Sequence, residues 1–395
     1  MKTRPPNDEM RNDALVSEVR VLGKPAASRR RFLLGAAATA AGFPMTAVAQ
    51  TAPVSLRFQG AWSAKDIFHE YALDYAKRVS EMSGGRLRIE VLPAGAVVKP
   101  FDLLDAVHKG VLDGCHAVSA YWSGKNSAFW LFGNGPAVGM DANQLLAWMA
   151  YGGGKDLYDE LLARVMNLNV VGFLYGPMPT QPLGWFKKPV ALAAQFKGLR
   201  YRTTGLSGEL FRQMGAAVNA LTEAEIVPAM RQGLIEAAEF NNATSDRWLG
   251  LPEVSKTCML QSYHQPAEAF EVLINRKKYE ALADDLKTIV KYAAEAASAD
   301  MSWKAIHRYS EDYAWLRDKQ GVKFSRTPAE VLRAQMRAWG AVTGRRMKEN
   351  PFFEKVFKSQ LGWARRTVAW AQDTIVDSRI AYDYWFPKKP APERK

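Results

Sequence analysis

The chain has 395 residues, of which 48% are hydrophobic and 24% are charged, and its formal net charge is +13. This composition is that of a globular protein and excludes a disordered chain, a collagen or a coiled-coil rod. At about 150 residues per domain, the length suggests roughly two domains. No apolar run reaches the ~18 residues that a membrane span requires. Basic residues are mixed with acids along the chain, which favours a solvated surface over nucleic-acid binding.

The N-terminal region is typical of an export signal. Arg29-Arg30-Arg31-Phe32-Leu33 precedes a modest apolar stretch that ends at Ala47-Val48-Ala49. A charged region, a short apolar region and an A-x-A site are the parts of a signal peptide, and the paired arginines fit the twin-arginine route. A basic amphipathic helix is the alternative. We therefore expect residues 1–49 to be removed on export to the periplasm, which lowers the net charge from +13 to +9.

The first part of the mature chain alternates strands and helices. The most regular helix runs from about Lys65 to Met82, with apolar residues at three- and four-residue steps, and Gly84 and Gly85 end it. This order of elements is typical of an α/β domain with a parallel sheet. The predicted strands are 55–60, 86–92 and 114–120, and the predicted helices are 65–82 and 101–109.

The middle of the chain repeats this alternation and predicts a second α/β domain, with a return to the first. The predicted helices are 141–150, 208–214 and 223–232, and the predicted strands are 169–175, 183–186, 199–202, 235–240 and 269–275. From Tyr279 to about Asp383 the pattern is almost entirely helical and rich in aromatic residues. Thr327 is expected to be the N-cap of one of these helices, with Pro328 at its first helical position. The aromatic residues are either core or an exposed stripe that docks on another subunit.

Most catalytic motifs are absent. Residues 152–156 have the sequence GGGKD, which lacks the Ser or Thr of a phosphate loop, and the five histidines are scattered. No nucleophile and base stand in a known pattern, so we expect a protein that is not an enzyme. Cys115 and Cys258 are interpreted as buried apolar residues, with a single disulfide as the alternative.

Several polar residues follow predicted strands, where open α/β sheets bind ligands. An arginine such as Arg202 can grip a carboxylate with two parallel hydrogen bonds, and a buried acid such as Glu239 needs a partner. Two glutamine carbonyls and one carboxylate suit a hard cation. The alternative is a set of surface residues with one salt bridge. The candidates are Tyr121, Trp122, Gln181, Arg202, Glu239 and Gln265.

At these residues the sequence resembles the periplasmic solute-binding subunits of TRAP transporters, the DctP family, and within it the α-keto-acid-binding, TakP-like branch. The likeness covers about residues 53–385. The spacings from Gln181 to Arg202 and from Glu239 to Gln265 also agree with that branch. The segments that carry it are 120–125 (AYWSGK), 180–186 (TQPLGWF), 197–202 (KGLRYR), 225–230 (EIVPAM) and 235–240 (IEAAEF).

The resemblance implies a two-lobed periplasmic-binding-protein-like α/β fold with a ligand cleft between the lobes and long C-terminal helices. Residues 50–175 would form mainly the first lobe and 176–275 mainly the second, with a crossover. Residues 276–395 would form a helical region that bridges the lobes and is a candidate dimer contact. The protein would capture an organic monocarboxylate, a 2-oxo or 2-hydroxy acid, and deliver it to the membrane permease. An exported enzyme and a sensor-associated binding protein are the alternatives.

The resemblance also assigns roles to residues. Arg202 would pair with the substrate carboxylate, Gln181 would lie at both ligand and cation, and Tyr121 and Trp122 would contact the substrate. Glu239, the carbonyl of Phe240 and Gln265 would bind a sodium or calcium ion that bridges the substrate.

One departure concerns the residues after that acid–aromatic pair. They are Asn241-Asn242-Ala243, where the branch has a small apolar residue and a glycine. Asn241 or Asn242 is therefore expected to add a polar contact to a substrate that is larger or more hydroxylated than pyruvate, and Asn241 is the candidate site residue.

Overall fold

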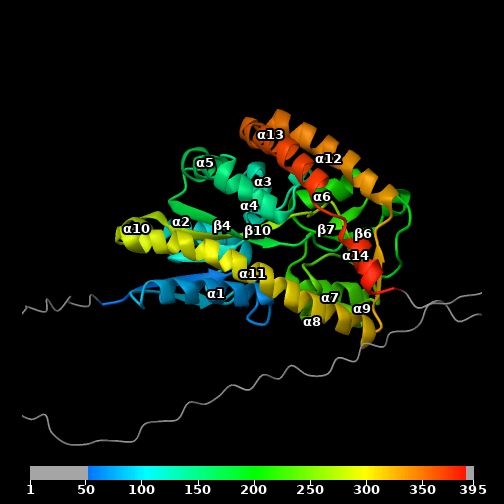
Figure 1. Ribbon diagram of the computed structural model, residues 1–395, viewed down its shortest axis with the longest axis horizontal. Helices are drawn as coiled ribbons and strands as arrows, with labels where there is room; N and C mark the ends of the chain where they lie inside the picture. Colours follow the sequence, from blue (N-terminus) through cyan, green and yellow to red (C-terminus); the bar gives the residue numbers. More distant parts are fainter. Residues whose placement is uncertain (1–51, 388–395) are drawn as a thin grey trace, which may run out of the picture. The chain divides into compact units, whose positions relative to one another are not determined.

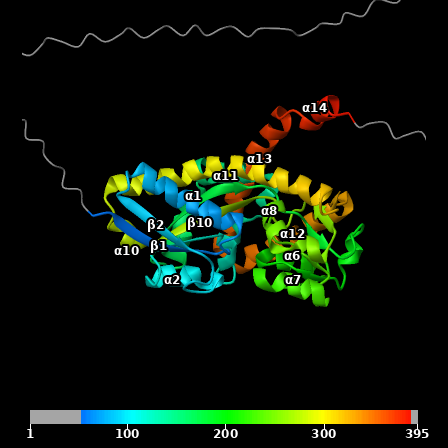
Figure 2. The same ribbon diagram turned by 90° about the horizontal axis from the view of Figure 1, so that it is seen from below.

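The computed structural model describes residues 52–387, and the predicted export signal lies outside the described residues. The chain forms two α/β lobes, each built on one sheet and joined by long helices (Figures 1 and 2). The two-lobed α/β prediction is confirmed.

The first lobe is built on a five-stranded sheet whose central strands are buried. All eight residues of the strand Glu268–Asn275 are buried, although it comes late in the chain. The sheet order is β2 (Leu87–Leu92), β1 (Val54–Gly60), β3 (Gly114–Ala117), β10 (Glu268–Asn275) and β4 (Val170–Met178). Its helices are α1 (Ile67–Met82), α2 (Leu103–Lys109), α3 (Trp130–Gly133), α4 (Ala142–Tyr151), α5 (Gly154–Glu160) and α10 (Arg276–Glu280).

The periodicity that predicted α1 is its buried face. Ile67, Tyr71, Tyr75 and Val79 are all buried, because residues three and four apart lie on one side of a helix. Asp66 caps the helix, with its side chain accepting a hydrogen bond from the amide of Phe68.

The second lobe is built on a six-stranded sheet with a smaller core around Trp185 and Met230. Thr222 and Glu225 form a capping box at the start of its longest helix, which the sequence predicted at 223–232. The sheet order is β11 (Lys323–Arg326), β9 (Thr257–Leu260), β5 (Gly184–Phe186), β8 (Ala237–Ala238), β6 (Arg200–Arg202) and β7 (Ala217–Asn219). Its helices are α6 (Gly205–Gln213), α7 (Glu223–Gln232), α8 (Ala243–Leu249) and α9 (Leu251–Val254).

The expectation of parallel sheets is wrong in one respect. β10 runs antiparallel to both of its neighbours in the first sheet, and β5 runs antiparallel to both of its neighbours in the second. Each of these strands enters its sheet directly after a crossing from the other lobe, without the helix that a parallel connection requires. The crossing segments are residues 179–183 and 261–267.

Long helices connect the two lobes. The 35-residue helix α11 (Asp284–Asp318) is about 52 Å long at 1.5 Å per residue. It packs against α1 and β4 of the first lobe and against α8 of the second (Figure 2). α12 (Ala329–Glu349) lies on α6, and α13 (Pro351–Thr374) returns to α3, α4 and α5 (Figure 1). Pro328 is the N-cap residue of α12, so the prediction that Thr327 caps this helix and Pro328 begins it is wrong by one position.

The last helix, α14 (Ser378–Trp385), projects away from the lobes (Figure 2). None of its residues is buried, and Ile380, Tyr384 and Trp385 are about three quarters exposed, at 73%, 75% and 73%. No helix between residues 52 and 387 combines the length and the apolar character that crossing a membrane demands. Cys115 in β3 and Cys258 in β9 are buried free thiols, which confirms their apolar interpretation and excludes the disulfide.

Candidate functional site

Arg202 and Glu239 form a buried ion pair at the carboxyl ends of two inner strands of the second sheet. Arg202 ends β6 and Glu239 follows β8, and because these strands are parallel neighbours the chain leaves both at the same edge. Nη1 of Arg202 donates to Oε1 of Glu239 at 3.1 Å and to its carbonyl oxygen at 2.8 Å. The two side chains are 8% and 1% exposed.

The rest of the guanidinium is held by the backbone. Nε and Nη2 of Arg202 each donate to the carbonyl of Leu221 at 3.0 Å. Four of the five N–H groups are thereby used within the described residues, and one on Nη2 remains for a ligand. Burial raises the pKa of Glu239 above its ordinary value, and the charge of Arg202 opposes that rise.

Gln181 and Gln265 come from the two crossing segments and lie side by side. The backbone N–H of Gln181 donates to the backbone carbonyl of Gln265 at 3.2 Å, and the two side chains are 3% and 4% exposed. Within the described residues, Oε1 of each glutamine is buried and has no hydrogen-bond partner. Buried hydrogen-bond acceptors normally have a partner, so two unpaired oxygens indicate a place for a bound group. We call the place where the crossing segments 179–183 and 261–267 meet the junction.

An acid that the sequence did not single out adjoins these glutamines. Glu268, the first residue of β10, is 4% exposed. It accepts from Nε2 of Gln181 at 2.7 Å and from Nδ2 of Asn134 at 2.6 Å. Burial raises its pKa to about 7, and the nearby charge of Glu239 adds to the rise. The available signal was the presence of two glutamates, Glu268 and Glu271, in a strand whose other residues are mostly apolar.

Tyr121 extends the site from the first lobe. It lies in the short 3₁₀ turn Ser119–Trp122 and packs against Phe101 and Trp62. Burial raises the pKa of its phenol, and the charge of Arg202 opposes this shift, so the hydroxyl lies within electrostatic reach of the guanidinium.

The structure places the side chain of Trp122 in the core of the first lobe. Its side chain is fully buried in the first lobe, where Nε1 donates to the carboxylate of Glu271, and Tyr158 donates to the same carboxylate. Successive residues of a tight turn point in different directions, so Trp122 is fully buried in the core while Tyr121 packs against Phe101 and Trp62.

The two asparagines after Phe240 have different surroundings. Asn242 caps α8, accepting from the amides of Thr244 and Ser245. Asn241 is 9% exposed, and its Nδ2 is buried with no partner among the described residues. The ring of Phe240 lies 5.9 Å from the guanidinium of Arg202. Asn241 therefore keeps a free donor, whereas Asn242 is committed to the helix.

Direct contacts join the lobes beside the site. Oγ of Ser245 donates to Oδ1 of Asp66 at 3.1 Å, and Oγ of Ser63 donates to Oε1 of Glu223 at 3.1 Å. Burial raises the pKa of Asp66 to about 7. Gly205, at the start of α6 in the second lobe, lies against the indole of Trp130 in the first.

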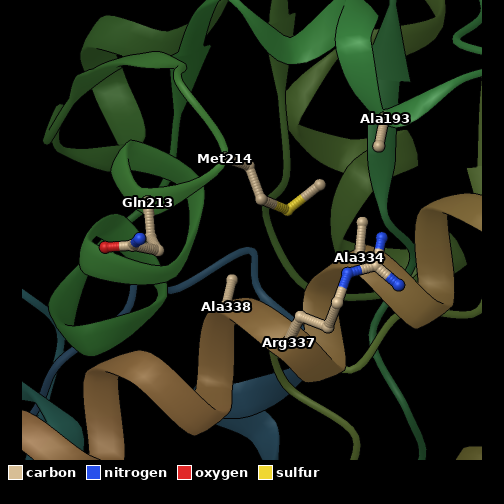
Figure 3. A pocket seen from close by; sticks show the side chains of 6 residues that line it. All are labelled: Ala193, Gln213, Met214, Ala334, Arg337 and Ala338. Atoms are coloured by element: carbon tan, nitrogen blue, oxygen red, sulfur yellow. The ribbon is translucent and has the colours of Figure 1, made fainter.

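A pocket of about 240 Å³ lies elsewhere, between α6, α12 and the turn Ala193–Phe196 (Figure 3). It is lined by Gln213, Met214, Arg337 and three alanines, and none of the predicted site residues borders it. Between residues 52 and 387, no group of three or more His, Cys, Asp or Glu residues is arranged to hold a metal ion. A cation at the junction would therefore depend on amide and carbonyl oxygens together with Glu239.

Comparison with known families identifies the lineage. Residues 58–350 match the family model for DctP, described as bacterial extracellular solute-binding protein, family 7. The chain belongs to the DctP family. A monocarboxylate 2-oxoacid-binding periplasmic protein of Nostoc sp. is 34% identical over 226 residues, which are 57% of this chain and 61% of that relative. The match thus spans about three fifths of the curated relative.

Solved structures of TRAP solute-binding proteins share the fold of this DctP-family chain. One from Bordetella bronchiseptica, a mixed-occupancy dimer with calcium and picolinate, has a TM-score of 0.78 at 25% identity and covers 85% of this chain and 98% of its own. One from Pseudoalteromonas atlantica, with sodium and pyruvate, has a TM-score of 0.77 at 27% identity and covers 85% and 99%. Family membership and fold are established by these matches.

Proposed function

We propose that this protein is the periplasmic solute-binding subunit of a TRAP transporter. It captures a small organic monocarboxylate of the 2-oxo or 2-hydroxy acid class together with a cation, and delivers it to the membrane permease. The observation that carries the proposal is the buried Arg202–Glu239 pair beside two unpaired buried glutamine oxygens. The Nostoc relative, named for 2-oxoacid binding, supports the substrate class.

Arg202 is the residue for the substrate carboxylate. It is buried, it supplies a fixed positive charge, and one N–H on Nη2 is free within the described residues. A charge-assisted hydrogen bond to a carboxylate is about twice as strong as a neutral one. Tyr121 and Asn241 are proposed as further contacts, because a phenol and an amide donor select among the oxygens of an organic acid.

The donor set at the junction fits a sodium or calcium ion. Hard cations prefer carboxylate, amide and carbonyl oxygens, and the unpaired Oε1 atoms of Gln181 and Gln265 are of this kind. Glu239 and the carbonyl of Phe240 complete the proposed set. Arg202 already balances the carboxylate of Glu239, and the bound ion would supply positive charge for the carboxylate of the substrate.

Binding assays on the mature protein, residues 50–395, test this function. Thermal-shift and calorimetric titrations with pyruvate, other 2-oxo acids, 2-hydroxy acids, sugar acids and dicarboxylates are run with and without sodium or calcium. A ligand of the native state raises the melting point by mass action. We expect one class of monocarboxylate to shift it in a cation-dependent way. No shift with any carboxylate, in protein freed of ligand by unfolding and refolding, would contradict the proposal.

Two substitutions connect that binding to the site. Arg202→Ala should abolish carboxylate binding, and Glu239→Ala should remove its dependence on the cation. The matched control is Arg200→Met, on the same strand, because Arg200 forms an exposed pair with Glu236 and should leave binding unchanged. Wild-type affinity in Arg202→Ala would reject the assigned role.

We further propose that α14 and its exposed aromatic residues form a homodimer contact. Eight residues project from the lobes with no buried side chain, and the Bordetella bronchiseptica relative is a dimer.

We also propose that the protein is exported by the twin-arginine route. Replacing Arg29 and Arg30 with lysine should retain the full-length precursor inside the cell, as fractionation and blotting would detect.

A further inference from the structure

Asn242 begins a chain of hydrogen bonds that crosses from the second lobe to the first. Its Oδ1 accepts from the backbone N–H groups of Thr244 and Ser245, each at 3.0 Å, so its Nδ2 lies on the other side of the amide. Nδ2 donates to Oγ of Ser245 at 3.2 Å, and this oxygen lies 3.1 Å from Oδ1 of Asp66 in the first lobe. Because an amide nitrogen only donates, the single proton of the Ser245 hydroxyl is left for Asp66.

The Asp66 end of this chain is buried between the lobes. The side chains of Asp66 and Ser245 are 4% and 1% exposed. Oδ1 of Asp66 accepts both from Ser245 and from the backbone N–H of Phe68, the latter at 2.8 Å. The other oxygen of this carboxyl group takes part in neither bond, so both bonds persist whether or not that oxygen carries a proton.

A second contact between the lobes has the same chemistry in the opposite direction. Oγ of Ser63, which lies between β1 and α1, donates at 3.1 Å to Oε1 of Glu223, the first residue of α7. Each lobe thus supplies one serine and one acid, and we call the contacts Ser245–Asp66 and Ser63–Glu223 the interlobe latch. The phenol of Tyr121 at the candidate site lies within electrostatic reach of both acids, so the latch adjoins that site.

We propose that the interlobe latch, with Asn242 as its support, holds part of the ligand-free protein in the closed form and slows the release of a bound solute without touching it. One hydrogen bond of this kind corresponds to a factor of about 2–10 in the ratio of closed to open protein. Asn242 then acts on closure, whereas Asn241 keeps a free donor for the solute. The effect on release rests on the proposed function, but the closure of the ligand-free protein does not.

The test measures the distance between the lobes in the ligand-free mature protein. Spin labels are placed at Lys109→Cys and Gln232→Cys, the exposed last residues of α2 and α7, on the side of the lobes away from α11 (Figure 2). Both native cysteines are buried, so labelling is directed to the introduced ones. Double electron–electron resonance should show a closed and an open population in the otherwise unchanged protein.

Three substitutions should each lower the ratio of closed to open protein about 2–10-fold. Ser245→Ala and Ser63→Ala each remove one contact, and the two together should lower the ratio further. Asn242→Asp preserves the cap of α8, because aspartate caps a helix as well as asparagine does. It offers the Ser245 hydroxyl an acceptor in place of a donor, and should therefore turn that proton away from Asp66.

The controls separate the latch from the cap of α1, which Asp66 also forms. Asp66→Asn keeps an oxygen for both bonds and should stay close to the wild type, whereas Asp66→Ala should open the lobes. Asp141→Ala removes the cap of α4, at an exposed position outside the latch, and should leave the distances unchanged. Circular dichroism establishes that each variant folds, and if Asp66→Ala does not, the two serine variants decide.

Two results would overturn the inference: a wild type that is entirely open without solute, or the same ratio of closed to open protein in the wild type and the serine variants. Stopped-flow release of pyruvate, with CaCl₂ present, separates this inference from the proposed function. Pyruvate binding with unchanged distances in the serine variants rejects the latch alone. Distances that depend on the latch, without binding of any carboxylate, support the latch and reject the proposed function.

Discussion

Replacing Arg202 with methionine should destabilise the protein as well as abolish ligand binding. The substitution leaves Glu239, 1% exposed, without an opposite charge, and removes both donors to the carbonyl of Leu221. Breaking a buried pair from one side costs about 3–5 kcal/mol, because an uncompensated charge stays buried. With an unfolding entropy of ~2.1 cal/mol/K per residue and roughly 340 residues, the melting point should fall by about 4–7 °C.

The second substitution of the cycle should recover most of this loss. In Arg202→Met with Glu239→Gln no buried charge remains, and replacing both partners of a buried pair is often neutral for stability. Urea and thermal unfolding of the wild type, both single variants and the double variant give a coupling free energy, which we expect to be at least about 2 kcal/mol. The double variant should remain unable to bind a carboxylate.

The neighbouring surface pair provides the control. Arg200 starts β6 and Glu236 precedes β8; their side chains lie 3.4 Å apart but are 49% and 38% exposed. Exposed ion pairs are worth about 0–1 kcal/mol, so Arg200→Met and Glu236→Gln should melt close to the wild type. If Arg202→Met is no less stable than Arg200→Met, or the double variant is as unstable as Arg202→Met, the reasoning about burial is refuted.

Three further predictions concern pH, lobe closure and assembly. Burial holds the pKa of Asp66, Asp246, Glu268 and Glu271 at about 7, above the ordinary values of aspartate and glutamate, so the folded state keeps protons that the unfolded chain releases. Burial lowers the pKa of His116 and His264 to about 3, which opposes this effect with two groups against four. The metal-free melting point should therefore rise from about pH 8 to about pH 6, less steeply in Asp66→Asn, and a flat profile would count against it. Gly205→Ala should weaken carboxylate binding in calorimetry, because its methyl group would collide with Trp130 across the lobes; the control Gly198→Ala has a similar positive φ but open space, and an equal effect of both would remove the argument. Replacing Ile380 and Trp385 on α14 with serine should convert a dimer into a monomer in light scattering, and an unchanged mass would reject that contact.

Local patterns in the sequence predicted much of the fold. The helices predicted at 65–82 and 223–232 depend on residues within a few positions of one another, and α1 and α7 form there. The direction of β5 and β10 was not predictable in this way. It depends on the chain crossing between lobes without a helix, which no short segment records.

The part of the candidate site that was predicted consists of polar residues at the ends of predicted strands. The sequence placed Arg202 and Glu239 after neighbouring strands, and the structure joins them in one buried pair. It did not reveal Glu268, because the residues that hydrogen-bond to Glu268 are Asn134 and Gln181, which are 134 and 87 positions away along the chain. It did not show that Trp122 lies in the core of the first lobe, because a local pattern does not tell which of two adjacent aromatic residues is fully buried.

The helix α11 sets the mechanics of any motion between the lobes. It runs unbroken for 35 residues, and its first half is tied to α1 by ion pairs such as Arg78–Asp300, while its second half is tied to α8 by Arg247–Asp312. A continuous helix contains no joint, so the lobes separate only by flexing it along its length. Long helices curve gently, with radii of about 60–100 Å, because small changes in many hydrogen bonds add up. Because α11 is tied to both lobes, it resists a large change in the angle between them, and small changes of angle are spread over many of its backbone hydrogen bonds.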